Sequence, residues 1–515
     1  MNRRTAVNIL SNWAAFIVGT AITFVLSPIV VHALGDVRYG LWGVIGSIVG
    51  YLGLLDLGVR VGVTRFVARY DATGDRVAVN RIITTSFTLF AGIGSAAVLL
   101  GAGLALLLPR IVHVPPDLLT EGSLAVAIGG VTVAAALLGG VFGGSLAGLQ
   151  RLAALNAIDL GTEVVRAVAV VLTLRAGGGL VALSVVQLTA VVTRGLIYVA
   201  ANRRFQPGLR IARALWDTDT LRQILRFSAY AMILHVSAIV IFSSDAMVIA
   251  ALMPVAQVTF FVIAGNLSQA ALQVLGGVSR ALYPLVSARQ ATEGTLGTAR
   301  LIRDSVRLTT IVVLPIVVTF LVRGGTFIGL WMGTSYGGPS GAVLRILSVG
   351  LCVAASYQVL ASNIMALNLH RGLVPPFVLE AVANLGLSIG LGYVMGVNGV
   401  AWGTTIPRAA VALAFAPWFA RRELGIGVRE YAVHAWVRPL GCMAPFAAAT
   451  ILVDRVWPAG GLVLFFAQVL LVLPVAVLGA WLFGLQRDER SRLRAAVRAG
   501  WARRPFAARA GAGVA

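Results

Sequence analysis

Asp56 and Arg60 place two opposite charges inside an apolar stretch of the chain. Residues 39–65 are otherwise nearly all apolar or glycine, and this is longer than the roughly 20 residues that a helix needs to cross a bilayer. Residues four apart lie on the same face of one helix. Counting back by threes and fours adds three glycines to that face: Gly53, Gly50 and Gly46.

This charged face cannot point into lipid. A carboxylate and a guanidinium are tolerated in hydrocarbon only against a partner or a wet cavity, while glycines allow another helix to approach closely. One interpretation is a buried Asp56–Arg60 pair that only locks helix packing. We favour a functional site, because ionisable groups within membrane spans are functional in most cases.

Two further apolar stretches carry polar residues in helical register. One stretch, 153–174, has them at spacings of three, four and three: Asn156, Asp159, Glu163 and Arg166. If its first turn lies among headgroups, Asn156 and Asp159 are merely interfacial. The other, 256–286, has Asn266, Gln269, Gln273 and Arg280 on one side. Single charges also interrupt three other stretches: Asp245, Glu380 and Arg408.

Together these residues predict a hydrated cavity with two kinds of group. Arginine holds phosphate through a planar fork and stays charged in a poorly hydrated site, so a pyrophosphate would fit. We predict that the substrate contacts Arg60, Arg166, Arg280, Arg408, Asn266, Gln269 and Gln273. The carboxylates could bind and release a coupling ion, H⁺ or Na⁺: Asp56, Asp159, Glu163, Asp245 and Glu380. No other cofactor is expected.

The composition excludes a soluble globular protein. Of 515 residues, 58% are hydrophobic and 12% charged, and the mean hydropathy is +0.90. The net charge of +22 does not indicate nucleic acid, because the arginines fall between apolar segments, as a topology signal would. Cys352 and Cys442 lie in separate apolar runs and indicate neither a disulfide framework nor a metal site.

The pattern predicts an all-α polytopic membrane protein with about fourteen spans. Their approximate ranges are 8–34, 39–68, 82–109, 121–149, 153–174, 179–200, 227–252, 256–286, 304–323, 341–368, 373–396, 399–419, 434–453 and 459–484. Arginines are concentrated in alternate connections, whereas the opposite connections hold about one each: Arg38, Arg110, Arg175, Arg323 and Arg455. By the positive-inside rule, both termini are cytoplasmic.

The spans divide into five predicted parts: a six-helix lobe (1–205), a cytoplasmic interfacial linker (206–226), a second six-helix lobe (227–425), two extra helices (426–485) and a basic cytoplasmic tail (486–515). Within the linker, Asp217 is a candidate cap for a short interfacial helix. A shift of 219 residues aligns the lobes weakly and places Arg60 next to Arg280. Such duplication is common in secondary transporters, whose site lies between the repeats.

The N-terminal residues are similar to a known family. The stretch from Ser27 to Val59, followed by Thr64 to Ala68 and an ATGD loop, resembles oligosaccharide flippases of the multidrug/oligosaccharidyl-lipid/polysaccharide (MOP) exporter superfamily, in particular O-antigen and exopolysaccharide exporters. The first span lacks an arginine beyond Arg4, unlike the peptidoglycan-precursor flippases.

The resemblance implies an alternating-access transporter of the bacterial cytoplasmic (inner) membrane. It would flip polyprenyl-pyrophosphate-linked sugar units from the inner to the outer leaflet for cell-surface polysaccharide synthesis, with membrane lipids and polysaccharide-assembly proteins as other partners. The positions that match the family's charged sites are Asp56 and Arg60 in one lobe and Asp245 and Arg280 in the other.

Three other functions fit the sequence less well. A cation-coupled multidrug exporter would favour a cavity dominated by acids, whereas arginines accompany the acids here. A membrane polysaccharide polymerase or ligase would need a sizeable outer loop, and the outer loops are short, so we expect no enzyme. A passive scaffold does not explain charges deep in the spans. The chain has no GxxxxGK[ST] motif for ATP.

Overall fold

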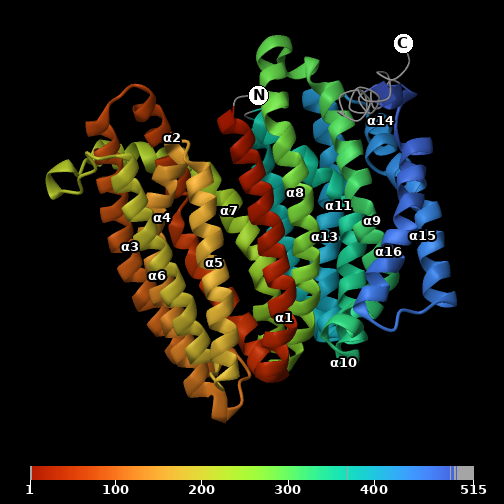
Figure 1. The fold of residues 1–515 in the computed structure, drawn as a ribbon, viewed down its shortest axis with the longest axis horizontal. Helices are drawn as coiled ribbons and strands as arrows, with labels where there is room; N and C mark the ends of the chain where they lie inside the picture. The colour runs from red at the N-terminus through yellow and green to blue at the C-terminus, as the bar shows by residue number, and fades with distance from the viewer. Residues whose placement is uncertain (1–2, 368, 488, 492–493, 496–515) are drawn as a thin grey trace, which may run out of the picture. The chain divides into compact units, whose positions relative to one another are not determined.

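The computed structural model describes residues 3–367, 369–487, 489–491 and 494–495 of the protein. At some helical positions, Arg280 among them, it describes the backbone alone. This part of the chain is helical and contains no β-strand (Figure 1). Eleven of its segments are long and apolar enough to span a bilayer. The all-α membrane class is confirmed, and the count of fourteen stays a prediction.

The helices follow the predicted spans closely. In chain order they are α1 (Arg3–Leu52), α2 (Val59–Ala72), α3 (Arg76–Ile111), α4 (Leu119–Gly148), α5 (Leu152–Arg175), α6 (Leu180–Phe205), α7 (Thr218–Leu252), α8 (Ala256–Gly297), α9 (Ala299–Met332), α10 (Thr334–Gly337), α11 (Pro339–Ala366), α12 (Val374–Met395), α13 (Val397–Leu424), α14 (Val428–Ala432), α15 (Arg438–Val456) and α16 (Leu462–Gly479). Short 3-10 or π-helical turns join or extend several of them.

The boundary between the first two predicted spans differs from expectation. Instead of a connection over 35–38, α1 continues past a kink at Gly35, whose φ of 71° is open to glycine at little cost. Beyond the kink, the carboxylate of Asp36 accepts a hydrogen bond from the Tyr336 hydroxyl at 2.5 Å, and its carbonyl accepts one from Thr259 Oγ1 at 2.6 Å. The kink therefore directs α1 onto α8 and α10.

Contacts divide the chain into two compact units. The first contains the described residues of Met1–Ala270, Trp331–Leu347 and His370–Arg408, and the second those of Ala271–Leu330, Ser348–Leu369 and Ala409–Ala515. The predicted lobes, linker and tail are a different division, based on topology, and they stay predictions. Most of the tail lies outside the described residues.

In the first unit, α4 is the central helix of a tightly packed group. It packs against α2, α3 and α6, and α3, α4 and α6 lie side by side in orange to yellow in Figure 1. Gly101 of α3 and Gly130 of α4 meet so closely that a Cβ on Gly101 would lie 2.7 Å from the Gly130 Cα. Without a hydrophobic force between helices in lipid, such close backbone approach is a main source of packing energy.

Asp217 begins α7, as the sequence predicts. Its carboxylate accepts hydrogen bonds from the Thr220 hydroxyl at 2.5 Å and the Thr220 N–H at 2.9 Å, which satisfy the first turn of the helix. These bonds, the hydroxyl first, lower the pKa of Asp217. The expected short interfacial helix is wrong in one respect: α7 continues without a break into the membrane span.

The second unit contains a buried ion pair that joins α9 to α15 and α16. Arg323 is 1% exposed and donates to Asp454 at 2.8 Å and to Gln468 at 2.6 Å. Its guanidinium also lies 4.6 Å from the centre of the Phe465 ring. The apolar pattern predicts that Arg323 lies in a connection between spans. This prediction is wrong, because α9 extends to Met332 and Arg323 lies within it.

We expect Gly101→Leu to lower the melting temperature of the detergent-solubilised protein and Gly103→Leu to leave it nearly unchanged. Both glycines lie on α3, but Gly101 meets the α4 backbone, whereas a Cβ on Gly103 has no atom within 4 Å. Overpacking typically costs about 1–3 kcal/mol, and a backbone atom cannot turn aside as a side chain can. Size-exclusion chromatography after heating measures the difference. Equal melting of the two variants would contradict the α3–α4 contact.

Candidate functional site

The helix that carries Asp56 and Arg60 is broken between them. A short 3-10 helix, η1 (Gly53–Asp56), ends at Asp56, and α2 begins at Val59. Leu57 and Gly58 between them have φ values of 50° and 71°. A left-handed conformation is costly for leucine, and such strain is concentrated at functional sites. The expected continuous helix is therefore wrong at this point.

Asp56 and Arg60 nevertheless pair across the break. Arg60 Nε lies 3.8 Å from Asp56 Oδ2, and the Arg60 N–H points to Asp56 Oδ1 at 3.4 Å. The Arg60 side chain is 53% exposed and that of Asp56 22%. The two groups thus form a loose pair whose guanidinium remains open to other ligands.

The glycines that admit α2 lie on α4. A Cβ on Gly140 would lie 2.7 Å from Arg60 Nη2, and one on Gly148 would lie 2.8 Å from the Thr64 carbonyl oxygen. The Thr64 hydroxyl donates to the Gly144 carbonyl at 3.1 Å. These glycines are spaced by four, a signal that the sequence analysis did not use. Of the three glycines predicted on the charged face, only Gly50 would bring an added Cβ within 4 Å of a neighbour, namely Ser243.

The polar stripe of α5 faces neighbouring helices. Asn156 donates to Ser11 Oγ of α1 at 3.0 Å, and Asp159 accepts a hydrogen bond from the Tyr198 hydroxyl of α6. Glu163 and Arg166 form a two-point ion pair, with Nε to Oε2 at 3.0 Å and Nη2 to Oε1. All four stripe residues are partly buried. The predicted common face is confirmed.

Arg194 of α6 belongs with these groups, although the sequence analysis did not single it out. Its positive charge lies within electrostatic range of Glu163 and Tyr198. The charge of Arg60 also lies within electrostatic range of Tyr198. The available signal was the position of Arg194 inside the predicted span 179–200. We call the resulting set the N-terminal charged cluster; it comprises Asp56, Arg60, Asp159, Glu163, Arg166, Arg194 and Tyr198.

Asp245 is at the centre of a second cluster, on α7, α12 and α13. It is 3% exposed, and its carboxylate accepts hydrogen bonds from Thr404 Oγ1 at 2.7 Å and Ser388 Oγ at 3.1 Å. Asn384 Nδ2 donates to Thr404 Oγ1 at 3.0 Å. The Ser388 and Thr404 hydroxyls also lie 3.3 and 3.4 Å from the Val400 carbonyl oxygen. We call these five residues the Asp245 cluster.

The groups that hydrogen-bond to the Asp245 carboxylate are hydroxyls. No salt bridge to Asp245 is found among the described residues, although Arg408 of α13 lies within electrostatic range of it. The neutral hydroxyls and the carbonyl are the ligand type that hard cations prefer, and a proton on the carboxyl could donate to the same oxygens. Ser388 and Thr404 were missed by the sequence analysis, since hydroxyl residues are common in apolar helices.

Glu380 and Arg408 pair with one another. Arg408 Nε lies 3.3 Å from Glu380 Oε1, with side-chain exposures of 11% and 6%, and the guanidinium lies 5.3 Å from the centre of the Phe242 ring. The roles predicted for them, ion coupling and substrate contact, stay predictions. A purely structural ion pair would show the same burial and the same mutual pairing.

The polar residues of α8 are only partly placed. Asn266 is exposed and lies within hydrogen-bonding reach of the Tyr39 hydroxyl of α1, and Gln269 is half-buried. Gln273 is exposed, and the side chain of Arg280 lies outside the described residues. The predicted facing of Arg60 and Arg280 therefore stays a prediction.

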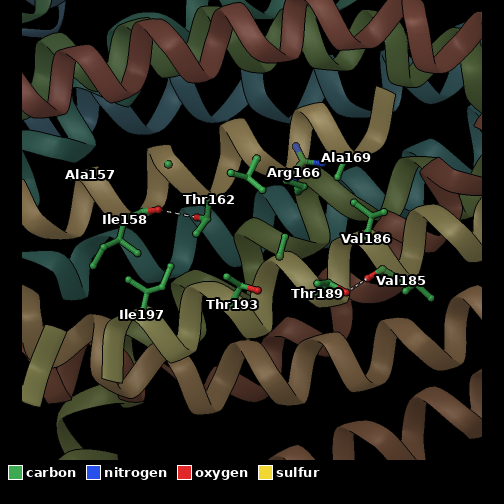
Figure 2. A pocket seen from close by; sticks show the side chains of 13 residues that line it. Ala157, Ile158, Thr162, Arg166, Ala169, Val185, Val186, Thr189, Thr193 and Ile197 are labelled. Atoms are coloured by element: carbon green, nitrogen blue, oxygen red, sulfur yellow. Dashed lines mark hydrogen bonds between the residues drawn. The ribbon is translucent and has the colours of Figure 1, made fainter. Parts of the chain in front are cut away.

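Two cavities adjoin the charged stripe of α5. A groove of about 620 Å³ runs between α5 and α6 (Figure 2), and it is lined by Ala157, Ile158, Gly161, Thr162, Val165, Arg166, Ala169, Val185, Val186, Thr189, Ala190, Thr193 and Ile197. A smaller inner cavity of about 180 Å³ lies among α1, α5 and α6, and it is lined by Thr23, Leu26, Ser27, Val30, Tyr39, Trp42, Arg166, Val170, Leu183 and Gln187. Arg166 lines both.

Comparisons with known proteins agree with this architecture. The model of a polysaccharide biosynthesis protein family matches residues 6–290. A comparison with curated proteins gives no match.

Solved structures match over most of the chain. The lipid II flippase MurJ in an inward closed conformation has a TM-score of 0.71 at 12% identity, over 93% of this chain and 98% of that one. A multidrug resistance MATE family transporter of the MOP superfamily, in an inward-facing conformation, has a TM-score of 0.66 at 14% identity, over 79% of this chain and 93% of that one. A MOP superfamily transporter from Pyrococcus furiosus has a TM-score of 0.60 at 15% identity, over 84% of this chain and 97% of that one. At these identities the likeness shows the fold.

We expect Arg408→Met to destabilise the protein by about 3–5 kcal/mol, because it leaves the Glu380 carboxylate buried without its cation. Adding Glu380→Gln should restore much of this loss, because no unpaired charge then remains. Thermal melting of the two single variants and the double variant measures the coupling.

The matched control is the exposed pair Arg222 and Asp219, which should contribute no more than about 1 kcal/mol. If the Glu380 and Arg408 losses simply add in the double variant, the two side chains do not depend on each other, and the pair is contradicted.

Proposed function

Because the chain belongs to the polysaccharide biosynthesis protein family of the MOP exporter superfamily, we propose that it flips lipid-linked oligosaccharides. The substrate would be a polyprenyl-pyrophosphate-linked sugar unit, moved from the inner to the outer leaflet of the bacterial inner membrane with both termini cytoplasmic. Ion-coupled alternating access would drive the movement. The protein is a multi-pass membrane transporter by its fold and family.

The observation that carries the proposal is the N-terminal charged cluster. It brings together three guanidiniums and three carboxylates from η1, α2, α5 and α6, and of these elements η1 and α6 belong to candidate membrane spans. Arg60 is half-exposed and only loosely paired, so its planar fork can exchange Asp56 for a phosphate oxygen. A diphosphate carries the charge and the several acceptor oxygens that more than one guanidinium can share. A neutral sugar alone would not require such a cluster.

The Asp245 cluster supports ion coupling. A buried carboxylate among hydroxyls and a carbonyl can take a proton or bind Na⁺ through oxygens alone. Its ligands come from α7, α12 and α13, so any relative shift of these helices changes the affinity for the ion. A ligand drives a conformational change only if it binds the two states differently, and a site built from three helices meets that requirement.

The first experiment is to delete the gene and follow lipid-linked oligosaccharide. Complete single repeat units that accumulate on the inner leaflet, with loss of surface polysaccharide, are the expected result. Units that reach the outer face unpolymerised would indicate a polymerase or ligase instead. Unchanged glycans with new drug sensitivity would indicate a multidrug exporter, a function compatible with the same fold.

We expect Arg60→Gln to reduce flipping of a prenyl-pyrophosphate-linked sugar in proteoliposomes by at least about tenfold, since a hydrogen bond to a charged group contributes roughly 1.5–3 kcal/mol. The matched control is Arg222→Gln on α7, whose side chain is 76% exposed. The protein level in the membrane is measured for both variants. If Arg60→Gln and the control flip the substrate equally well, Arg60 is not part of the substrate site.

We expect Asp245→Asn to abolish the dependence of flipping on the H⁺ or Na⁺ gradient, because the amide cannot carry the charge that binds either ion. Flipping is measured under each gradient separately, which identifies the ion. Asp219→Asn, at an exposed carboxylate of α7, is the matched control. Unchanged gradient dependence in Asp245→Asn would exclude the Asp245 cluster and transfer the coupling role to Asp56, Asp159, Glu163 or Glu380.

A further inference from the structure

The groove between α5 and α6 is formed by the exposed apolar sides of the two helices. Val165 of α5 is 69% exposed, and Val185 and Ile197 of α6 are 46% and 40% exposed. Both helices are long enough to span a membrane, and α6 is also apolar enough, so this exposed apolar side is suited to contact lipid chains. Figure 2 shows the lining side chains of the two helices on either side of the groove.

Two of the three threonines in the groove lining use their hydroxyls within their own helix. The Thr162 hydroxyl donates to the Ile158 carbonyl at 2.8 Å, and the Thr189 hydroxyl donates to the Val185 carbonyl at 2.8 Å, as the dashed lines in Figure 2 mark. Each hydroxyl is thus satisfied within its own helix and does not require a polar ligand. Small residues, Gly161 on α5 and Ala190 on α6, leave the space between the helices open.

Arg166 is the one charged residue of the groove lining, and it also lines the inner cavity. On the inner side its neighbours include Tyr39, Trp42 and Gln187, which combine aromatic faces with an amide. A guanidinium therefore lies between an apolar groove and a cavity that also offers hydroxyl and amide groups, from Thr23, Ser27 and Gln187. This is the order of chemical groups in a lipid-linked sugar: hydrocarbon, phosphate, then sugar.

The pairing of Arg166 allows it to accept an anion. Its present partner is Glu163, and Arg194 is a second cation within electrostatic range of that carboxylate. When Arg166 turns to a phosphate, Glu163 keeps a cationic neighbour and is not left uncompensated. The exchange therefore avoids the penalty of an unpaired charge inside the membrane.

We propose that the α5–α6 groove holds the isoprenoid tail of the lipid-linked substrate, with the phosphate next to the tail bound by Arg166. This site deepens the proposed function and rests on it. The occupant is a prenyl phosphate instead of an ordinary membrane lipid, because Arg166 also lines the inner cavity, where a phospholipid has no sugar to place.

The test measures binding of undecaprenyl phosphate to the purified full-length protein by native mass spectrometry. We expect Gly161→Leu to weaken binding about tenfold, because the new side chain occupies the groove and displaces buried methylene groups of the tail. The matched control is Gly92→Leu on α3. Both glycines are exposed helical positions with no atom within 4 Å of an added Cβ, so both variants should fold. Equal binding by the two variants would overturn the proposal.

A second comparison tests the role of Arg166. Arg166→Gln should reduce binding of undecaprenyl phosphate about tenfold while leaving binding of the uncharged undecaprenol unchanged. Arg175→Gln, at the exposed end of α5, is the matched control. If Arg166→Gln weakens binding of undecaprenyl phosphate and of undecaprenol equally, Arg166 does not bind the phosphate. Displacement of undecaprenyl phosphate by an equal amount of phosphatidylglycerol would make the groove a general lipid site and overturn the isoprenoid occupant.

The same variants separate this proposal from the proposed function. Proteoliposomes containing the wild-type protein are assayed for flipping of a prenyl-pyrophosphate-linked sugar. If the wild type flips the substrate and Gly161→Leu is as active as Gly92→Leu, the proposed lipid site in the groove is contradicted and the flippase function is not. No flipping by the wild type, together with loss of prenyl phosphate binding in Gly161→Leu only, would contradict the flippase function and keep the lipid site.

Discussion

A charge inside a membrane must be paired or must face water, and this constraint separates the arginines of the protein into two groups. Arg323 and Arg408 are almost completely buried and lie 2.8 and 3.3 Å from a carboxylate. Removing a partner from such a pair is costly, so these arginines hold helices together. Arg60 and Arg166 keep 53% and 24% of their side chains exposed. A guanidinium in this state can exchange a carboxylate for a ligand phosphate.

The same constraint applies to the backbone, because a break in a membrane helix exposes N–H and C=O groups that water cannot reach. Directly after the break at Leu57 and Gly58, α2 is held against α4, where glycines bring the two backbones close and Thr64 donates to the Gly144 carbonyl. This packing can hold the unfavourable conformation of Leu57. The strained turn thus positions Arg60 against α4 and keeps its guanidinium open.

The two clusters have different chemistry and are built from different helices. The N-terminal charged cluster uses η1, α2, α5 and α6 and presents guanidiniums, which suit phosphates. The Asp245 cluster uses α7, α12 and α13 and presents hydroxyl and carbonyl oxygens around a carboxylate, which suit a small cation or a proton. Separate sites for substrate and ion are what coupled transport requires, because each ligand can then bias the conformation through its own contacts.

The sequence by itself determined the membrane class, the positions of the helices, the Asp56–Arg60 pair and the common face of the α5 stripe. These features depend on hydrophobic length and on spacings of three and four residues, which are local. Only the tertiary structure decided the break at Leu57, the pairing of Glu380 with Arg408, the hydroxyls around Asp245 and the position of Arg166 between two cavities. These depend on how each helix is rotated against neighbours far away in the chain, and packing sets that rotation.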